Sequence, residues 1–125
     1  MMGNHQHAVA VVDNDPGVLD SLRFMLEVAG HHVGVYASAA EFLEDRTAQP
    51  AYLIVDQHMP AMTGLELTAR LRSEGKLIPT VLITAAPSPD IVQRAALLGI
   101  EKVLEKPLAE RDLLGFVEAH RNLAP

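Results

Sequence analysis

The sequence predicts an α/β fold, in which a doubly wound parallel sheet of five strands carries five helices on its two faces. Three observations predict it. Short runs of consecutive apolar residues, typical of strands covered on both faces, recur along the chain. Each run is followed by a polar turn and then by apolar residues at helical spacing. The connections are short, and this regular alternation of strand and helix favours a parallel sheet.

The first strand and helix show the pattern clearly. Residues 8–12 are a continuous apolar run that stops at Asp13. Asp15 can cap the next helix, with Pro16 at its first position, where the missing N–H removes no hydrogen bond. The apolar residues of this helix are Val18, Leu22, Met25, Leu26 and Ala29, and Gly30 ends it.

The remaining elements follow the same logic. The other predicted strands are residues 33–36, 52–55, 80–83 and 102–105. Three helices open with a hydroxyl residue that can accept an N–H of the first turn, and these caps are Ser38, Thr63 and Ser88. Gly75 and Gly99 close the third and fourth helices. The last helix runs from about Ala109 to His120 and turns Leu113, Phe116 and Val117 inward.

Length and composition limit the function classes. A chain of 125 residues, 49% of them hydrophobic, fits one domain, which we expect over residues 8–122 after a disordered tail over residues 1–7. The net charge of −6 and the scattered Lys and Arg argue against direct nucleic acid binding. The absence of cysteine excludes disulfides and thiolate metal sites. No apolar stretch is long enough to span a membrane, so we expect a cytoplasmic protein.

Polar residues of different kinds follow four of the five predicted strands. Ligands of open α/β sheets bind beyond the carboxyl ends of the strands, so these side chains are the candidate site. They are Asp13, Asn14 and Asp15 after the first strand, Asp56 after the third, Thr84 after the fourth and Lys106 after the fifth.

This set of side chains suits phosphoryl transfer. Carboxylate and amide oxygens can hold Mg²⁺, and one carboxylate can attack phosphorus to form an acyl phosphate. The ammonium of Lys106 and the hydroxyl of Thr84 can hold the phosphoryl oxygens. Each residue alone could instead be structural: Asp15 a helix cap, Asp56 a turn residue, Thr84 a strand end and Lys106 a solvated charge. Their coincidence at successive strand ends favours the phosphoryl-transfer interpretation.

At these motifs the chain resembles the receiver domain of response regulators in two-component signalling, from about Ala8 to His120. The matching segments are Val-Val-Asp at 11–13, Val-Asp-Gln-His-Met-Pro at 55–60 with Gly64, Ile-Thr-Ala at 83–85 and Glu-Lys-Pro at 105–107. Ser-Ala-Ala-Glu-Phe-Leu at 38–43 is similar to the second helix of the transcription-factor branch. The resemblance implies a flavodoxin-like sheet with strand order 2-1-3-4-5.

The resemblance also implies roles for residues of this chain. Asp56 would be the phosphoacceptor, with Mg²⁺ held by the side chains of Asp13, Asn14 and Asp56 and by the backbone carbonyl of His58. Thr84 and Lys106 would contact the phosphoryl group, and the Lys106–Pro107 peptide would be cis. The donor would be a sensor histidine kinase, a phosphotransfer protein or a small acyl phosphate. Such a domain is a switch that promotes its own phosphotransfer and dephosphorylation, not an enzyme acting on an external substrate.

The family also implies a surface for partner binding and homodimerisation. This surface combines the fourth helix, the fifth strand and the fifth helix. Here we expect it to include Ile91, Ala95, Leu98 and the edge near Glu101 and Lys102. Whether the chain acts alone or is a piece of a longer regulator is open at this stage.

Three residues depart from the family pattern. Asn14 stands where a second acidic residue is usual, which predicts weaker Mg²⁺ binding because a full charge is removed. Val103 replaces the aromatic residue of the family's switch, so we expect the output to depend on Thr84 and a strand-four loop stiffened by two prolines. His58, two positions after the acceptor, could act on the phosphoryl group, although we expect its side chain to be simply exposed.

Two other function classes stay open on the sequence. Asn14 and Val103 are compatible with a pseudo-receiver, an interaction module that keeps the fold but is not phosphorylated. Asp13-Asn14-Asp15 also has the Asp-x-Asp form of haloacid-dehalogenase-like phosphatases. The phosphatase interpretation leaves the motif at 56–60 unexplained. The chain also lacks the late acidic motif of those enzymes and carries Pro16-Gly17 where they have a different turn.

Overall fold

The computed structural model describes residues 8–121, in which five strands alternate with five helices. The elements are β1 Ala8–Val12, α1 Pro16–Val28, β2 His32–Tyr36, α2 Ala39–Glu44, β3 Tyr52–Asp56, α3 Gly64–Ser73, β4 Thr80–Thr84, α4 Pro89–Leu97, β5 Lys102–Glu105 and α5 Glu110–Arg121. Every predicted strand and helix is present, with ends that differ by only a few residues. The expected disordered tail over residues 1–7 and the domain end at residue 122 lie outside the described residues.

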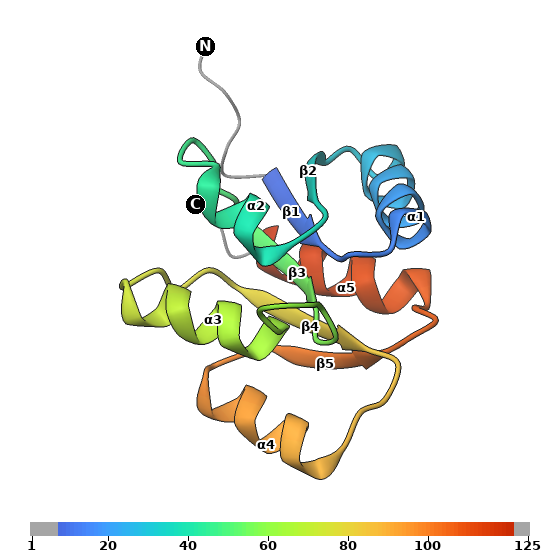
Figure 1. The fold of residues 1–125 in the computed structure, drawn as a ribbon. Coiled ribbons are helices and arrows are strands. Elements are labelled where there is room, and N and C mark those ends of the chain that lie inside the picture. Colours follow the sequence, from blue (N-terminus) through green and yellow to red (C-terminus); the bar gives the residue numbers. More distant parts are fainter. Residues whose placement is uncertain (1–7, 122–125) are drawn as a thin grey trace.

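The strands form one parallel sheet in the order β2-β1-β3-β4-β5, as Figure 1 shows. The predicted fold class and strand order are therefore confirmed. The chain runs from β1 outward to β2 and then crosses back to β3, so the direction of winding changes between β1 and β3. In open α/β sheets this reversal leaves a crevice at the carboxyl ends of the two strands, which is where Asp13 and Asp56 lie.

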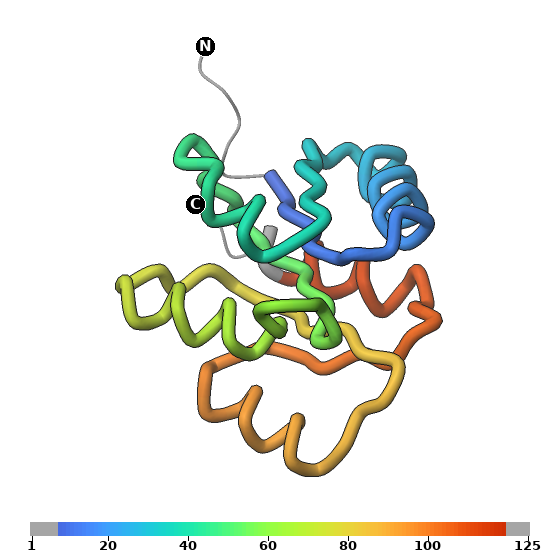
Figure 2. The backbone as a smooth tube through the Cα atoms, in the orientation of Figure 1, coloured from blue at the N-terminus to red at the C-terminus, as the bar shows by residue number. Residues whose placement is uncertain are grey.

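Helices cover both faces of the sheet (Figures 1 and 2), and an apolar core lies on each face. Leu22 and Leu26 of α1 and Phe116 of α5 pack on one face of the central strands. Residues of α2, α3 and α4, such as Phe42 and Leu71, pack on the other. All five residues of β3 and of β4 are buried. Burial on both faces explains why these strands are continuous apolar runs without alternation.

The predicted helix caps are present. Asp15 accepts the N–H of Gly17 at the start of α1, and Ser38 accepts the N–H of Glu41 at the start of α2. Thr63 and Glu66 form a reciprocal capping box on α3, and Ser88 caps α4. One detail of α1 differs from the expectation. Leu19 is buried with Leu22 and Leu26, whereas Val18, Met25 and Ala29 are only half-buried at the edge of the core.

The apolar face expected on α4 is also different. Ala95 is 1% exposed and belongs to the core, so it is not part of an available surface, whereas Ile91 and Leu98 pack against the core and stay partly exposed. The apolar side chains that α4 does present outward are Val92, 49% exposed, and Leu97, 81% exposed. The nine-residue helix turns its 91–95–98 side inward, because that side covers β4 and β5.

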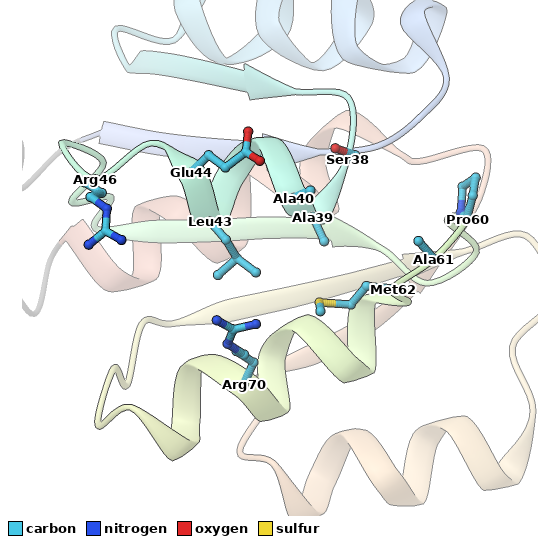
Figure 3. A pocket seen from close by; sticks show the side chains of 10 residues that line it. All are labelled: Ser38, Ala39, Ala40, Leu43, Glu44, Arg46, Pro60, Ala61, Met62 and Arg70. Atoms are coloured by element: carbon cyan, nitrogen blue, oxygen red, sulfur yellow. The ribbon is translucent and has the colours of Figure 1, made fainter.

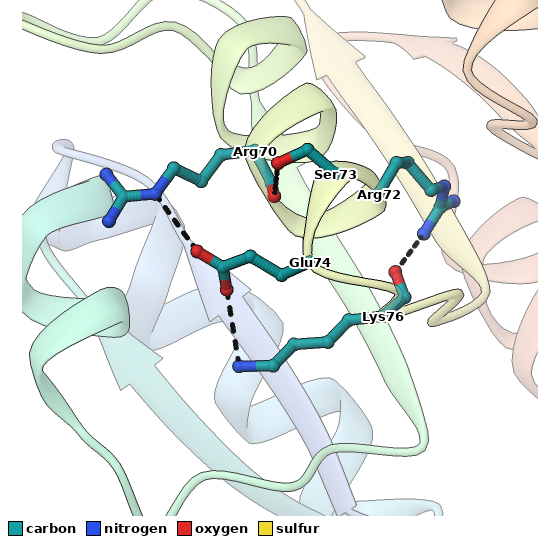
Figure 4. Close-up of polar contacts among 5 residues, drawn as sticks. All are labelled: Arg70, Arg72, Ser73, Glu74 and Lys76. Carbon is teal, nitrogen blue, oxygen red and sulfur yellow. Dashed lines mark hydrogen bonds and ion pairs between the residues drawn. The ribbon is translucent and has the colours of Figure 1, made fainter.

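A polar network closes the carboxyl end of α3, at the opposite edge of the sheet from Asp56 (Figure 4). Arg70 pairs with Glu74 at 3.2 Å, and Lys76 lies 3.6 Å from the same carboxylate. Arg72 donates to the carbonyls of Lys76 and Ile78 and, across to α4, to that of Leu98 at 2.8 Å. This guanidinium therefore ties together the ends of α3 and α4. None of the helices described between residues 8 and 121 has the length and apolar character needed to cross a membrane.

Candidate functional site

Two carboxylates and one ammonium meet at the carboxyl end of the sheet. Nζ of Lys106 lies 2.9 Å from Oδ2 of Asp13 and 3.3 Å from Oδ1 of Asp56. Asp13 follows β1 and Asp56 ends β3, and these strands are parallel neighbours, so their carboxyl ends share one edge. Lys106 follows β5, which is two strands away from β3, and its long side chain spans that distance. The structure thus brings together three of the predicted site residues.

Asp13 is held in place by the backbone on both sides. Its own N–H donates to the carbonyl of Tyr36 at the end of β2, and its Oδ1 accepts the N–H of Asp15 at 2.9 Å. The other oxygen, Oδ2, is buried and accepts no well-aligned hydrogen bond from the described residues, although Lys106 lies close to it. The contact with Lys106 is therefore an ion pair of poor hydrogen-bond alignment, and this oxygen keeps capacity for another ligand.

The turn after β3 presents backbone groups to the Asp56 carboxylate. The backbone N–H of His58 favours the ionised form of this carboxyl and so lowers its pKa. The carbonyl of Gln57 accepts N–H groups from Met59 and Gly64, both at 3.2 Å, and so faces away from the site. Within residues 8–121 no backbone N–H donates to the carbonyl of His58. That carbonyl is therefore free of backbone donors within the described chain.

Between the described residues, the side chains of the other predicted site residues form no hydrogen bond or ion pair with this trio. Two of these residues contact it through the backbone: the N–H of Asp15 donates to Asp13, and the carbonyl of Thr84 accepts the N–H of Lys106, both at 2.9 Å. Thr84 is fully buried, and its hydroxyl accepts the N–H of Ala86 at 3.1 Å, inside its own loop. Asn14 is exposed beside Asp13, and the Asp15 side chain caps α1. The side chain of His58 is exposed, as expected.

Comparison with known proteins decides the family. Residues 9–118 match the response regulator receiver domain. The chain belongs to that family. It is 32% identical over 126 aligned residues to response regulator protein TmoT of Ectopseudomonas mendocina. This alignment covers 99% of this chain and 57% of TmoT. Transcriptional regulatory protein FixJ of Azorhizobium caulinodans is 32% identical over 112 residues, 89% of this chain and 53% of FixJ.

The fold of this receiver domain agrees with that result. The solved structure of FixJ-N has a TM-score of 0.83 and 28% identity, and the match covers 100% of this chain and 98% of that one. The Lys106–Pro107 peptide is cis, as the family resemblance implied. The receiver domain spans about half the length of the first curated relatives that it matches, 57% of TmoT and 53% of FixJ.

The charges of the receiver site shift one another's protonation. Burial raises the pKa of the Asp56 carboxyl and the charge of Asp13 raises it further, while Lys106 and the His58 N–H lower it without reversing the shift. Burial alone would lower the pKa of Lys106, but its close contact with Asp13 and the charges of both aspartates outweigh this, so its pKa is raised. The lysine is therefore firmly protonated at neutral pH, and a second cation would favour ionisation of Asp56.

The donor set fits a hard divalent cation. Oδ2 of Asp13 lacks an aligned donor, the Asp56 carboxylate lies beside the same ammonium, and the His58 carbonyl is free. Oxygen ligands of this kind suit Mg²⁺. Among the described residues no group of three or more His, Asp or Glu side chains is arranged to hold a metal.

Two grooves flank the site. One, of about 650 Å³, lies between α1 and the β5–α5 loop and is lined by Val18, Met25, Lys106 and Leu108 among others. The second, of about 490 Å³, lies between α2 and α3, where Leu43, Met62 and Arg70 project into it (Figure 3). The first groove reaches Lys106, one of the three charged residues of the site. Asp56 itself is 3% exposed, which leaves only a narrow approach.

Sequence reasoning missed one residue of the site, Gln57. In the structure its side chain is buried and bonds the start of α3. Its position two residues after the apolar run 52–55 was the available signal, because buried amides are kept only where they are hydrogen-bonded.

Proposed function

We propose that this receiver domain accepts a phosphoryl group on Asp56 in the presence of Mg²⁺ and acts as a switch for a partner or output domain. The observation that carries this proposal is the convergence of Asp13, Asp56 and Lys106, with 2.9 Å and 3.3 Å between the ammonium and the two carboxylates. A buried pair of carboxylates costs stability, and burial next to a cation is an arrangement that functional sites use.

The chemistry asked of Asp56 is nucleophilic attack. A carboxylate oxygen of Asp56 forms a bond to phosphorus while the bond from phosphorus to the donor breaks, and the leaving group keeps that electron pair. The donor is a phosphohistidine of a sensor kinase or phosphotransfer protein, or a small acyl phosphate. Lys106 pairs with the oxygens of the transferred group, and the His58 N–H holds the carboxylate in place. Because these donors act in the cytoplasm, we infer that the reaction takes place there.

Mg²⁺, when bound, neutralises charge on the transferring phosphoryl group. The groups that would hold it are the carboxylates of Asp13 and Asp56 and the carbonyl of His58. Asn14 would contribute an amide oxygen in place of a charge, which weakens the site relative to one with a third carboxylate.

Thr84 would complete the phosphorylated site. Asp56 pairs with Ile83 across the sheet, and the hydroxyl of the next residue, Thr84, bonds its own loop at Ala86. The Ala86 bond uses only an acceptor lone pair of this hydroxyl, so its O–H can still donate to a phosphoryl oxygen. A movement of Thr84 toward the phosphoryl group would pull on the loop to α4 through the Ala86 bond, and Val103, half-buried against the core, would follow with little change of its own. The domain is in this view a switch that catalyses only its own phosphorylation and dephosphorylation.

The output and partners follow from the family. TmoT and FixJ are longer than this chain, and FixJ is a transcriptional regulatory protein. We infer that this domain controls an equivalent output in a longer regulator or a separate target, through the surface of α4, β5 and α5, which could also form a homodimer. The domain itself carries no nucleic-acid contact in this proposal.

Intact-mass measurement tests phosphorylation. Incubation with a small acyl phosphate and Mg²⁺ should add the mass of one phosphoryl group, and hydroxylamine should remove it. Asp56→Asn should abolish the addition, while Asp20→Asn, at an exposed aspartate of α1, should leave it intact. No addition to the wild-type chain would favour the pseudo-receiver alternative. Steady turnover of a phosphomonoester, lost in Asp13→Asn, would favour the phosphatase alternative.

A further inference from the structure

Gln57 is a buried polar residue directly after the proposed phosphoacceptor. It is 6% exposed, and the strand that precedes Asp56 is entirely apolar. A long amide side chain in such a place must find hydrogen-bond partners, because burying an unpaired amide is unfavourable. The hydrogen-bond partners of Gln57 lie on β4, in the turn after β3 and at the start of α3.

Gln57 accepts the first two N–H groups of α3. Its carbonyl accepts the N–H of Gly64 at 3.2 Å, and its side-chain Oε1 accepts the N–H of Leu65 at 2.9 Å. The next donor, the N–H of Glu66, goes to the hydroxyl of Thr63. The first N–H groups of a helix have no partner within the helix, so Gln57 and Thr63 together satisfy this end of α3.

The same bonds set the direction of one peptide unit at the site. The carbonyl of Gln57 and the N–H of His58 belong to one planar trans peptide and point in opposite directions. Because the carbonyl is held by the N–H groups of Met59 and Gly64, the N–H of His58 is directed back to the carboxylate of Asp56. The carbonyl of His58 is then left free of backbone donors within the described chain.

The start of α3 packs closely against the backbone at the end of β3. A Cβ built on Gly64 would lie 2.6 Å from the carbonyl oxygen of Asp56 and 2.7 Å from Cδ1 of Leu82. The first turn of α3 therefore rests directly on the backbone of the acceptor residue. A shift of this turn would be transmitted to the 57–58 peptide.

We propose that Gln57 is a positioning residue of the receiver site. Its side-chain oxygen holds the first turn of α3 against β3, and this contact fixes the 57–58 peptide, so that the His58 N–H bonds Asp56 and the His58 carbonyl faces the cation. The part concerning the cation rests on the proposed function, whereas the part concerning the His58 N–H does not. Groups that orient the ligands of a metal commonly change its affinity by about tenfold or more when they are removed.

The test uses two variants at the same helix end. Gln57→Met removes the side-chain acceptor at similar size. Thr63→Val removes the neighbouring cap, which also costs α3 one hydrogen bond but does not touch the 57–58 peptide. If the methionine variant does not fold, Gln57→Asn replaces it, because its amide is one methylene too short to reach Leu65. Two quantities are measured for each chain: the Mg²⁺ dissociation constant by calorimetry, and amide hydrogen exchange without metal.

We expect Gln57→Met to weaken Mg²⁺ binding about tenfold and to speed exchange of the His58 amide about tenfold or more. Thr63→Val should change both quantities by less than about twofold. Unchanged exchange at His58 in the Gln57 variant overturns the proposal. The proposal is also overturned if the wild-type chain binds Mg²⁺ and the Gln57 variant binds it equally tightly. It is overturned as well if Thr63→Val changes the two quantities as much as the Gln57 variant does. If the wild-type chain binds no Mg²⁺, the cation part of the proposed function fails, and the exchange measurement still decides the role of Gln57.

Discussion

The ammonium of Lys106 lies 2.9 Å from Oδ2 of Asp13, a fully buried residue, and no described residue donates a well-aligned hydrogen bond to that oxygen. The same ammonium lies 3.3 Å from Asp56. One cation thus compensates two neighbouring acids, which leaves a net negative charge in a largely water-excluded place. This charge balance and the close packing of the backbone around it determine how substitutions at the site change stability and Mg²⁺ binding.

Replacement of Lys106 by Met leaves both carboxylates without a cation. We expect the free energy of unfolding to fall by about 1–3 kcal/mol at neutral pH, less than for a fully buried pair because Lys106 is partly exposed. The pKa of Lys106 is raised, so its contribution persists up to the unfolded pKa of about 10.4 and is lost as the pH rises through the folded value. Urea unfolding at neutral and strongly alkaline pH measures this. Lys102→Met, at an exposed lysine of β5, should change stability by less than about 0.5 kcal/mol, and an equal loss there would refute the ion-pair account.

Asp56 should lower stability at neutral pH. Its pKa is raised in the fold, so the folded chain binds more protons than the unfolded chain, and stability falls as the pH rises from about 3.9 through the raised value. Asp56→Asn removes this effect and should be more stable than the wild-type chain at pH 7, with no gain near pH 3. Urea unfolding across this pH range is the measurement. Asp20→Asn, at an exposed position, should show no such pH-dependent gain; a gain of the same size there would contradict the assignment to Asp56.

Asn14→Asp should strengthen Mg²⁺ binding. The substitution adds a full negative charge beside Asp13, and we expect the dissociation constant to fall by about tenfold, which corresponds to about 1.4 kcal/mol. Calorimetric titration with Mg²⁺ compares the two chains. Asn14→Ser, which adds no charge, should not bind more tightly than the wild type. Equal affinities for Asn14→Asp and wild type would show that residue 14 does not face the cation.

Gly64→Ala should destabilise the domain strongly. The new Cβ would meet the Asp56 carbonyl oxygen at 2.6 Å, and a backbone atom cannot move aside as a flexible side chain can. We expect a loss of about 2 kcal/mol or more. Gly115→Ala in α5 is the matched control, since its Cβ meets nothing within 4 Å and alanine favours helix, so stability should rise by about 0.5–1 kcal/mol. Similar effects of the two substitutions on urea unfolding would exclude steric contact as the cause.

Ala61→Gly should stabilise the domain. Ala61 has a φ of 69°, and the N–H of Met62 donates to the carbonyl of Pro60 at 2.7 Å, so the loop makes a tight turn in a region that disfavours residues with a Cβ. Relief of the backbone strain at this position contributes about 1–2 kcal/mol. The greater freedom of glycine in the unfolded chain reduces this, so the free energy of unfolding should rise by about 0.5–1 kcal/mol. Ala69→Gly, at an exposed position inside α3, should instead cost about 1 kcal/mol. A loss at both positions in urea unfolding would show that Ala61 is not strained.

Much of the fold could be read from local patterns. The buried runs that became β1, β3 and β4, and the caps at Asp15, Thr63 and Ser88, depend on residues close to one another in the chain. The strand ends likewise pointed to Asp13, Asp56 and Lys106, because parallel strands bring their carboxyl ends to one edge. The exposure of Ala95 on α4 was predicted incorrectly, because residues 91, 92, 95, 96, 97 and 98 are all apolar and the sequence alone does not decide which of them face the sheet.

By itself, the sequence determined the order of elements, the strand ends and the chemical kinds of side chain gathered there, because these depend on periodicity and capping over a few residues. Only the tertiary structure decided that Lys106 is shared by two acids and that Gln57 joins β3 to the first turn of α3. These relationships join residues far apart in the chain or on different elements. Their distances depend on how the helices pack on the sheet, which no local pattern encodes.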